Sequence, residues 1–189
     1  MTSFITIVSG LPRSGTSLMM QMLGAGGMPL LTDARREADE DNPRGYFEFE
    51  AVKKIRQDSS WLRDAEGKAV KIIHALLRNL PPQHEYRIIM MNRDLREVIA
   101  SQRSMLQRLG HQGAQVSDDK LLKFFQRDLD DVREWVRCQP NIQVLGIEHR
   151  DCLLRTHEVA ATVNSFVGGF LDEQRMAGCV EPGLYRHRS

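Results

Sequence analysis

Cysteine is scarce in this chain of 189 residues. It occurs three times, an odd number without a C-x-x-C pair, at Cys138, Cys152 and Cys179. Such spacing argues against a disulfide framework and against a cysteine-based zinc site. We therefore expect reduced cysteines in a reducing compartment, which predicts a cytoplasmic protein.

The chain also lacks an excess of one charge and a long apolar run. Lys and Arg number 26 against 25 for Asp and Glu, so the formal net charge is +1. Because nucleic-acid modules usually carry a clear basic excess, we expect no nucleic-acid partner, although a local basic pocket is compatible with this balance. No apolar stretch approaches the ~18 residues that span a membrane, and no basic segment precedes the first apolar run. We therefore expect neither a membrane partner nor a signal peptide.

Hydrophobic residues make up 41% of the sequence, which is enough for one substantial core and too little for two ordinary domains. No internal repeat, low-complexity segment or linker is visible. We therefore expect a single domain over residues 1–189, with loops at 33–45 and 110–117 and a basic tail after residue 181.

Short apolar runs predict the strands. They lie at residues 4–9, 69–73, 87–91 and 141–147, with a further candidate at 29–32. Their nearly continuous apolar character is typical of strands that are covered on both faces. Apolar residues at helical spacing follow these runs, and Asp94 with Glu97 is similar to a capping box. Alternating strands and helices indicate an α/β fold, a three-layer α/β/α arrangement with a central parallel sheet that binds ligands at the carboxyl ends of its strands.

The segment Gly10-Leu-Pro-Arg-Ser-Gly-Thr-Ser17 joins the first strand to the first helix. It has the G-x-x-x-x-G spacing of a phosphate-binding loop, but Thr16 stands where a nucleotide triphosphatase has lysine. Converging amide groups and the helix N-terminus attract an anion, and Arg13 adds a guanidinium suited to phosphate or sulfonate oxygens. The predicted anion-binding residues are Gly10, Pro12, Arg13, Ser14, Gly15, Thr16 and Ser17.

This segment resembles the 5′-phosphosulfate loop of the sulfotransferase family, Pro-[Lys/Arg]-Ser-Gly-Thr-[Thr/Ser]. Its arginine form is most similar to tyrosylprotein sulfotransferases and many bacterial sulfotransferase-like proteins. The resemblance implies a single P-loop domain with a second motif, a strand-end Arg and a Ser eight residues later that hold the donor's 3′-phosphate. Arg93 and Ser101 have that spacing. By the same resemblance, Tyr185 and Arg186 in the tail could contact the nucleotide.

The resemblance implies an enzyme that moves a sulfonyl group from 3′-phosphoadenosine 5′-phosphosulfate (PAPS) to a hydroxyl or amine, leaving 3′-phosphoadenosine 5′-phosphate (PAP). Lys71 lies where the family often has a strand-end lysine that stabilises this transfer. Negative charge grows on the bridging oxygen, so Arg13 and Lys71 fit the role of stabilising cations. The six histidines are scattered without the spacing of a zinc site, and we expect no metal.

The acceptor needs a general base, for which the family uses histidine or glutamate. Glu48 is the first choice, because the segment from Asn42 to Glu48 resembles bacterial relatives. Asp33 is closer in spacing to the tyrosylprotein branch, and His74 is the histidine option. The acceptor could be a small molecule, a carbohydrate or a protein. Its site would come from residues 33–50, 110–117 and the tail, or from a partner such as a second copy of the chain.

Two other functions are compatible with the sequence. A P-loop nucleotide kinase or NTPase would share the loop, although Thr16 in the lysine position argues against it. A non-catalytic protein that binds a nucleotide bisphosphate is the second alternative, because the binding motifs are clearer than the base.

Overall fold

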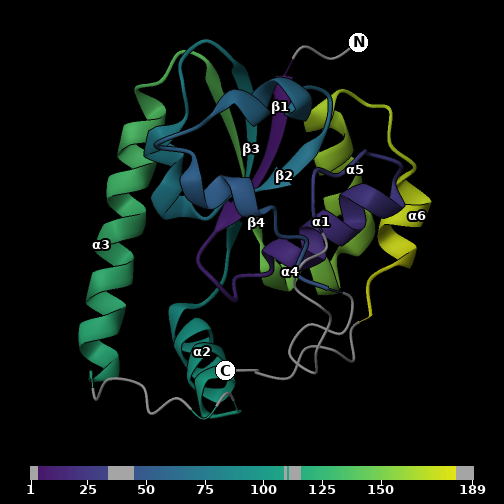
Figure 1. The fold of residues 1–189 in the computed structure, drawn as a ribbon. Helices are drawn as coiled ribbons and strands as arrows, with labels where there is room; N and C mark the ends of the chain where they lie inside the picture. The colour runs from purple at the N-terminus through teal and green to yellow at the C-terminus, as the bar shows by residue number, and fades with distance from the viewer. Residues whose placement is uncertain (1–3, 34–44, 109, 111–115, 182–189) are drawn as a thin grey trace.

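Four parallel strands form the centre of the molecule (Figure 1). The computed structural model describes residues 4–33, 45–108, 110 and 116–181. The sheet order is β2-β1-β3-β4, with the strands β1 (Phe4–Gly10), β2 (Ala69–Lys71), β3 (Glu85–Asn92) and β4 (Ile142–Glu148). Gly10 pairs with Met91, and Asn92 pairs with Glu148. The carboxyl ends of the strands therefore meet at one edge of the sheet, where the sequence predicts the site.

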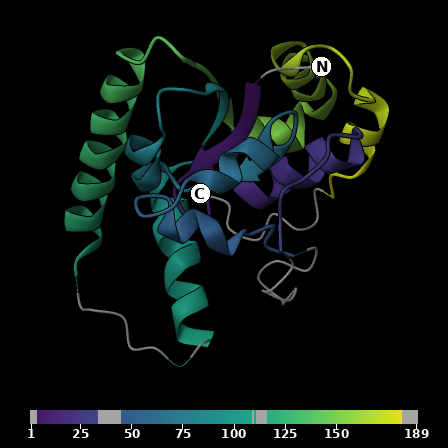
Figure 2. The same ribbon diagram turned by 45° about the horizontal axis from the view of Figure 1, so that its top comes forward.

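Helices cover both faces of the sheet, and Figures 1 and 2 show α3 on one side and α1, α5 and α6 on the other. The α-helices are α1 (Thr16–Ala25), α2 (Leu95–Arg108), α3 (Asp118–Arg137), α4 (His149–Leu154), α5 (Thr156–Val167) and α6 (Glu173–Gly178). Three short 3₁₀ helices are η1 (Glu50–Lys54), η2 (Ser60–Ala65) and η3 (His74–Asn79). The predicted three-layer α/β/α fold with a parallel sheet is confirmed.

The core has two parts because successive side chains of a strand point to opposite faces. Val8 and Ile89 belong to the cluster that includes α1, α5 and α6. Ile7 and Ile88, their neighbours in sequence, belong to the cluster that includes the 3₁₀ helices and α3. In a third, small cluster, Leu11 of the β1–α1 loop packs against apolar side chains of α2 and α3.

The strands differ in three respects from the prediction. β4 is an edge strand, and Val144 is 44% exposed, so the expectation that all strands are covered on both faces is wrong for this strand. The run at 29–32 forms a single bridge, from Leu30 to Ala69. β2 ends at Lys71, although the Ile72 amide still donates to the Val8 carbonyl at 3.0 Å.

The start of α2 fulfils half of the expected capping box. Asp94 Oδ1 accepts hydrogen bonds from the amides of Arg96 and Glu97, at 2.8 and 3.1 Å. The Glu97 side chain instead binds Arg93, which places it in the site described below. Among the residues that the structure describes, no helix is both long and apolar enough to cross a membrane.

Candidate active site

Two glycines, Gly10 and Gly15, flank the turn of the β1–α1 loop (residues 11–15). A side chain at either position would collide with neighbouring atoms, which would have to move. Gly10 has φ of 149°, and a Cβ there would lie 2.5 Å from Ser14 Oγ and 2.7 Å from the Met91 carbonyl oxygen. Gly15 has φ of 99°, and a Cβ there would lie 2.5 Å from His149 Cδ2. The loop therefore lies in close contact with the end of β3 and the first residue of α4.

Arg13 lies at the centre of this loop in a left-handed conformation, with φ of 75°, which is uncommon for a residue with a side chain. Its Nε donates a 3.0 Å hydrogen bond to Ser101 Oγ on α2. Its carbonyl accepts a 3.0 Å hydrogen bond from Arg93 Nη1. The structure thus brings both predicted motifs together, with Arg13 rather than Arg93 as the direct partner of Ser101.

Arg93 is oriented by a carboxylate that the sequence pattern assigned to a helix cap. Arg93 Nε donates to Glu97 Oε2 at 2.9 Å, and the two side chains are 10% and 8% exposed. The pair is enclosed, so its hydrogen bonds are protected from competing water. Arg13 and Arg93 therefore place two guanidinium groups at the carboxyl end of β3, with Glu97 as a neighbouring carboxylate.

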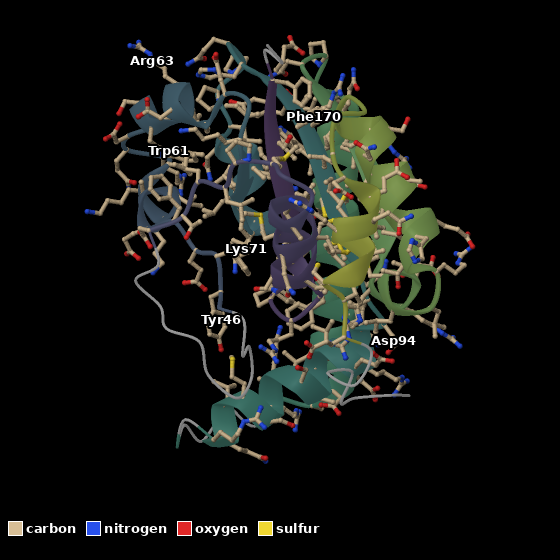
Figure 3. All side chains as sticks on the ribbon, turned by 90° about the vertical axis from the view of Figure 1, so that its right-hand side faces the viewer. Tyr46, Trp61, Arg63, Lys71, Asp94 and Phe170 are labelled. Carbon is tan, nitrogen blue, oxygen red and sulfur yellow. The ribbon has the colours of Figure 1, made fainter. Side chains whose placement is uncertain are left out.

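Lys71, at the end of β2, reaches the start of α1. Its Nζ donates to the Tyr46 carbonyl and lies 3.5 Å from Ser17 Oγ, which itself lies 3.4 Å from the same carbonyl. Figure 3 shows Lys71 and Tyr46 one above the other beside α1. The ammonium group also lies 5.9 Å from the centre of the Tyr46 ring. A third cation thus faces the N-terminus of α1.

Two of the three candidate bases lie together. The Asp33 amide donates to the Glu48 carbonyl at 3.2 Å, and Asp33 Oδ2 accepts from the Glu50 amide at 2.7 Å. Both candidate side chains are half-buried, and Glu48 follows two residues after Tyr46. Glu48 is therefore on the segment that contacts Lys71, and Asp33 is paired with that segment through its backbone.

His74 lies elsewhere, beneath the loop. Its Nδ1 is 3.2 Å from the Gly10 carbonyl oxygen, and its Nε2 is 2.5 Å from Asp128 Oδ2. Both ring nitrogens therefore contact the protein itself, and the side chain is buried, unlike the half-buried side chains of Asp33 and Glu48. Tyr185 and Arg186 lie outside the described residues.

His149 is part of the site but was missed by sequence reasoning. It is the first residue of α4, and its ring packs against Gly15. Burial, assisted by the Arg93 guanidinium and opposed by the Glu97 carboxylate, lowers the pKa of His149 to about 4. The ring is therefore neutral at pH 7 and can pack under the loop without adding charge. Its position directly after the fourth strand was the available signal.

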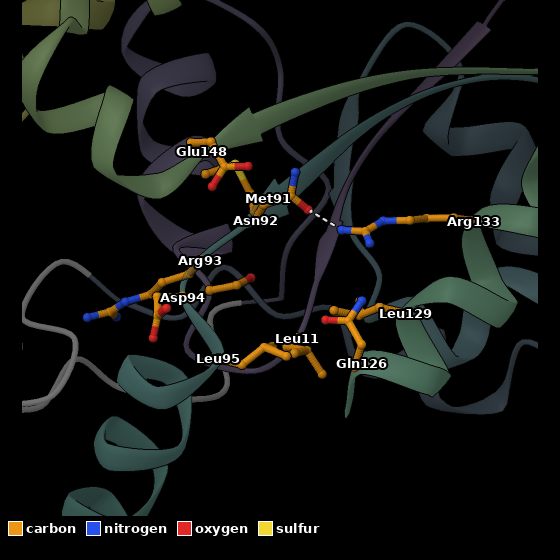
Figure 4. Close-up of a pocket in the computed structure, with 11 residues that line it drawn as sticks. Leu11, Met91, Asn92, Arg93, Asp94, Leu95, Gln126, Leu129, Arg133 and Glu148 are labelled. Carbon is orange, nitrogen blue, oxygen red and sulfur yellow. Dashed lines mark hydrogen bonds between the residues drawn. The ribbon is translucent and has the colours of Figure 1, made fainter. Parts of the chain in front are cut away.

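A cavity of about 260 Å³ opens beside the loop, between the end of β3 and α3 (Figure 4). Arg133 crosses its wall to donate a 3.1 Å hydrogen bond to Asn92 Oδ1. Ser14 also lines the cavity, and its buried Oγ has no hydrogen-bond partner within the described part of the chain. The other lining residues are Leu11, Met91, Arg93, Asp94, Leu95, Gln126, Leu129 and Glu148. In that same part of the chain, no group of His, Cys, Asp or Glu could hold a metal ion.

Comparison with known proteins supports the architecture. No protein-family model matches the chain, and no curated protein matches it in sequence. Among solved structures, the sulfotransferase domain of the olefin synthase from Synechococcus PCC 7002 superposes with a TM-score of 0.54 and 16% identity, over 98% of this chain and 83% of that one.

Two further sulfotransferases agree with this result. The sulfotransferase domain of the curacin biosynthetic pathway gives a TM-score of 0.50 at 13% identity, covering 98% of this chain and 78% of that one. The sulfotransferase of Alicyclobacillus acidocaldarius gives 0.50 at 15% identity, covering 96% and 87%. The chain therefore has the fold of sulfotransferase domains, as its resemblance to that family in two loop motifs predicts.

Proposed function

We propose that this protein is a sulfotransferase, with PAPS as the donor and a hydroxyl or amine as the acceptor. The observation that carries the proposal is the convergence of Arg13, Arg93 and Ser101 at a glycine-bounded loop. These residues come from three separate segments, and the resemblance to sulfotransferases independently assigns all three to donor binding. The shared fold supports the same reading.

The loop has the properties that a phosphate group requires. Its backbone turns from β1 into the N-terminus of α1, where amide groups and the helix dipole favour an anion. Ser14 adds a buried hydroxyl with no hydrogen-bond partner in the described residues. Arg13 and Arg93 bring positive charge to the same end of the sheet. A nucleotide with two separate phosphates matches this distribution better than a single small anion.

The donor, when bound, supplies a sulfonyl group attached to a phosphate leaving group. Transfer increases the negative charge on the oxygen between them, so cations fixed nearby lower the barrier. Arg13, in the loop before α1, and Lys71, at the end of β2 and 3.5 Å from Ser17 Oγ of α1, provide such cations. In phosphoryl transfer a metal ion commonly supplies this charge, and here we assign it to side chains.

The acceptor proton requires a base on the Lys71 side. Glu48 and Asp33 lie together there, held by the hydrogen bond between their backbones and by the start of η1. We assign the base to Glu48, which lies two residues after the Tyr46 carbonyl that binds Lys71, and a positioning role to Asp33, whose Oδ2 accepts from the Glu50 amide. The acceptor would then approach across the segment that carries Tyr46.

A thermal-shift screen with PAP, ATP, GTP and AMP tests the donor site. At a hundredfold excess over its dissociation constant, a ligand stabilises the folded state by about 2.7 kcal/mol. This corresponds to roughly 5–10 °C for a chain of this size. We expect PAP to give this shift and the mononucleotides little. Stabilisation by ATP without stabilisation by PAP would overturn the proposal in favour of a nucleotide kinase or NTPase.

Turnover of PAPS with a panel of phenol, alcohol and amine acceptors tests the chemistry. We expect Arg13→Ala and Lys71→Ala to lower the rate at least a hundredfold, while Lys68→Ala, which changes a lysine near the other end of β2, leaves it unchanged. Glu48→Gln should retain PAP binding and lose transfer. Full transfer by Glu48→Gln would refute the base assignment. If the wild-type protein binds PAP but turns over PAPS with none of the acceptors, the result would indicate a non-catalytic binding protein.

A further inference from the structure

His74 connects the β1–α1 loop to helix α3. It begins η3, three residues after Lys71, and is 5% exposed. On one side, its Nδ1 lies 3.2 Å from the carbonyl oxygen of Gly10, the last residue of β1. On the other side, its Nε2 lies 2.5 Å from Oδ2 of Asp128 on α3. Loop, imidazole and helix thus form one continuous chain of contacts across 118 residues of sequence, from Gly10 to Asp128.

Both partners of the imidazole are hydrogen-bond acceptors. A neutral imidazole carries one N–H group and can satisfy only one of them. Both contacts are satisfied when the ring carries two protons, or when the second proton sits on Asp128 and the carboxyl group donates to Nε2. In either case, Nδ1–H donates to the Gly10 carbonyl and Nε2 faces the Asp128 carboxyl group.

The contact with Gly10 fixes the point at which the chain leaves β1. Ser14 Oγ and the Met91 carbonyl crowd the Cα of Gly10, since they lie only 2.5 and 2.7 Å from the place that a Cβ would occupy. The hydrogen bond to His74 holds the carbonyl of the same residue. The Gly10 peptide group is therefore held from two directions, and its orientation sets the direction of the amide groups that follow in the loop.

We propose that His74 and Asp128 are a positioning pair that holds the β1–α1 loop in its anion-binding conformation. Neither residue touches the donor in this scheme. His74 orients the Gly10 carbonyl, and Asp128 orients His74. The inference deepens the proposed function, on which it rests for the identity of the anion, and it explains why a histidine so close to Lys71 does not serve as the base.

Two substitutions at His74 separate positioning from general stability. In His74→Asn, the amide nitrogen can occupy the place of Nδ1 and still donate to Gly10. In His74→Gln, the amide nitrogen can occupy the place of Nε2, which keeps the contact with Asp128 and loses the one with Gly10. We expect PAP affinity within about threefold of wild type for His74→Asn and about tenfold weaker binding for His74→Gln, since a lost hydrogen bond is of that order. The melting temperatures of the two variants should fall by similar amounts.

Substitutions at Asp128 provide a second test, in which the His74 side chain itself is unchanged. An asparagine can donate to Nε2 while Nδ1–H still donates to Gly10, so Asp128→Asn preserves both contacts with a neutral ring. Asp128→Ala removes the carboxylate that fixes the orientation of the ring, so the imidazole can turn away from the Gly10 carbonyl. We expect Asp128→Asn to bind PAP within about threefold of wild type and Asp128→Ala about tenfold more weakly. Asp131→Ala, at an exposed position of the same helix, is the matched control and should bind PAP like wild type.

Hydrogen exchange of the amides at residues 10–17, measured without ligand, makes the test independent of the donor's identity. We expect faster exchange there in His74→Gln and Asp128→Ala than in His74→Asn and Asp128→Asn. Equal exchange and equal PAP affinity in all four variants would overturn the positioning role. If wild type does not bind PAP, the proposed function fails, while the exchange measurement still decides whether the pair positions the loop.

Discussion

Arg13 Nε and Ser101 Oγ lie 3.0 Å apart although 88 residues separate them in the chain. The bond joins the centre of the β1–α1 loop to the second turn of α2. Because Ser101 is buried, the guanidinium is held by a group that water does not displace. The same arginine is linked through its carbonyl to Arg93, so the loop is attached to both the strand end and the helix that follow it.

Replacing Ser101 should weaken donor binding more than it weakens the fold. In Ser101→Ala, Arg13 loses the hydroxyl that holds its Nε, and ordering the guanidinium on binding costs about 1 kcal/mol more. We expect PAP to bind about fivefold more weakly by calorimetry, with a melting temperature within about 3 °C of wild type. Ser104→Ala, one turn further along α2, is the control, and an equal loss of affinity in both variants would contradict a specific role for Ser101.

The Gly10 position should tolerate no side chain. Gly10→Ala combines a φ of 149° with contacts of 2.5 and 2.7 Å, so strain and overpacking act together. We expect a loss of about 3 kcal/mol in the free energy of unfolding by urea titration. Gly27 has φ of 96° but nothing within 4 Å of a Cβ, so Gly27→Ala should lose about 1 kcal/mol from backbone strain alone. Similar losses in the two variants would show that the close contacts at Gly10 do not matter.

Short-range patterns predict the strands themselves but not their order in the sheet. The apolar runs of β1 and β3 are nearly continuous, and in the structure both are central strands covered on two faces. The run of β4 looks similar in sequence, yet this strand forms the sheet edge and leaves Val144 exposed. A strand's own residues do not specify its neighbours, so periodicity identified the strand and not its place in the sheet.

The site shows the same division between local and long-range information. The glycine spacing of the loop and the interval from Arg93 to Ser101 are local, and the structure brings the residues of these two patterns together. The pairing of Ser101 with Arg13 depends on a left-handed residue inside the loop, which spacing does not reveal. The contact of His74 with Asp128 joins residues 54 positions apart, and only the packing of α3 against η3 brings them together.

The neutral ring of His149 should make stability depend on pH. Its pKa is about 4 in the folded protein and about 6.5 in the unfolded chain, so between these values the unfolded state binds more protons. Stability from this residue is therefore fully present above pH 6.5 and is lost as the pH falls toward 4, by an amount of about 3 kcal/mol. Urea titrations at several pH values give the free energies of unfolding of wild type and His149→Gln. We expect the difference between the two free energies to become smaller as the pH falls. A difference that stays the same from pH 7 to pH 4 would contradict a buried, neutral His149 ring.

The enclosed pair of Arg93 and Glu97 should contribute more to stability than an exposed pair of the same spacing. In Glu97→Ala, the Arg93 guanidinium loses its carboxylate at a position that is 10% exposed, and an uncompensated buried charge costs about 3 kcal/mol. Asp151 and Arg155 are also four residues apart, but their side chains are 28% and 57% exposed. Asp151→Ala should therefore lose under about 1 kcal/mol. Equal losses by urea titration would mean that water reaches Arg93 as freely as Arg155, which would contradict an enclosed Arg93–Glu97 pair.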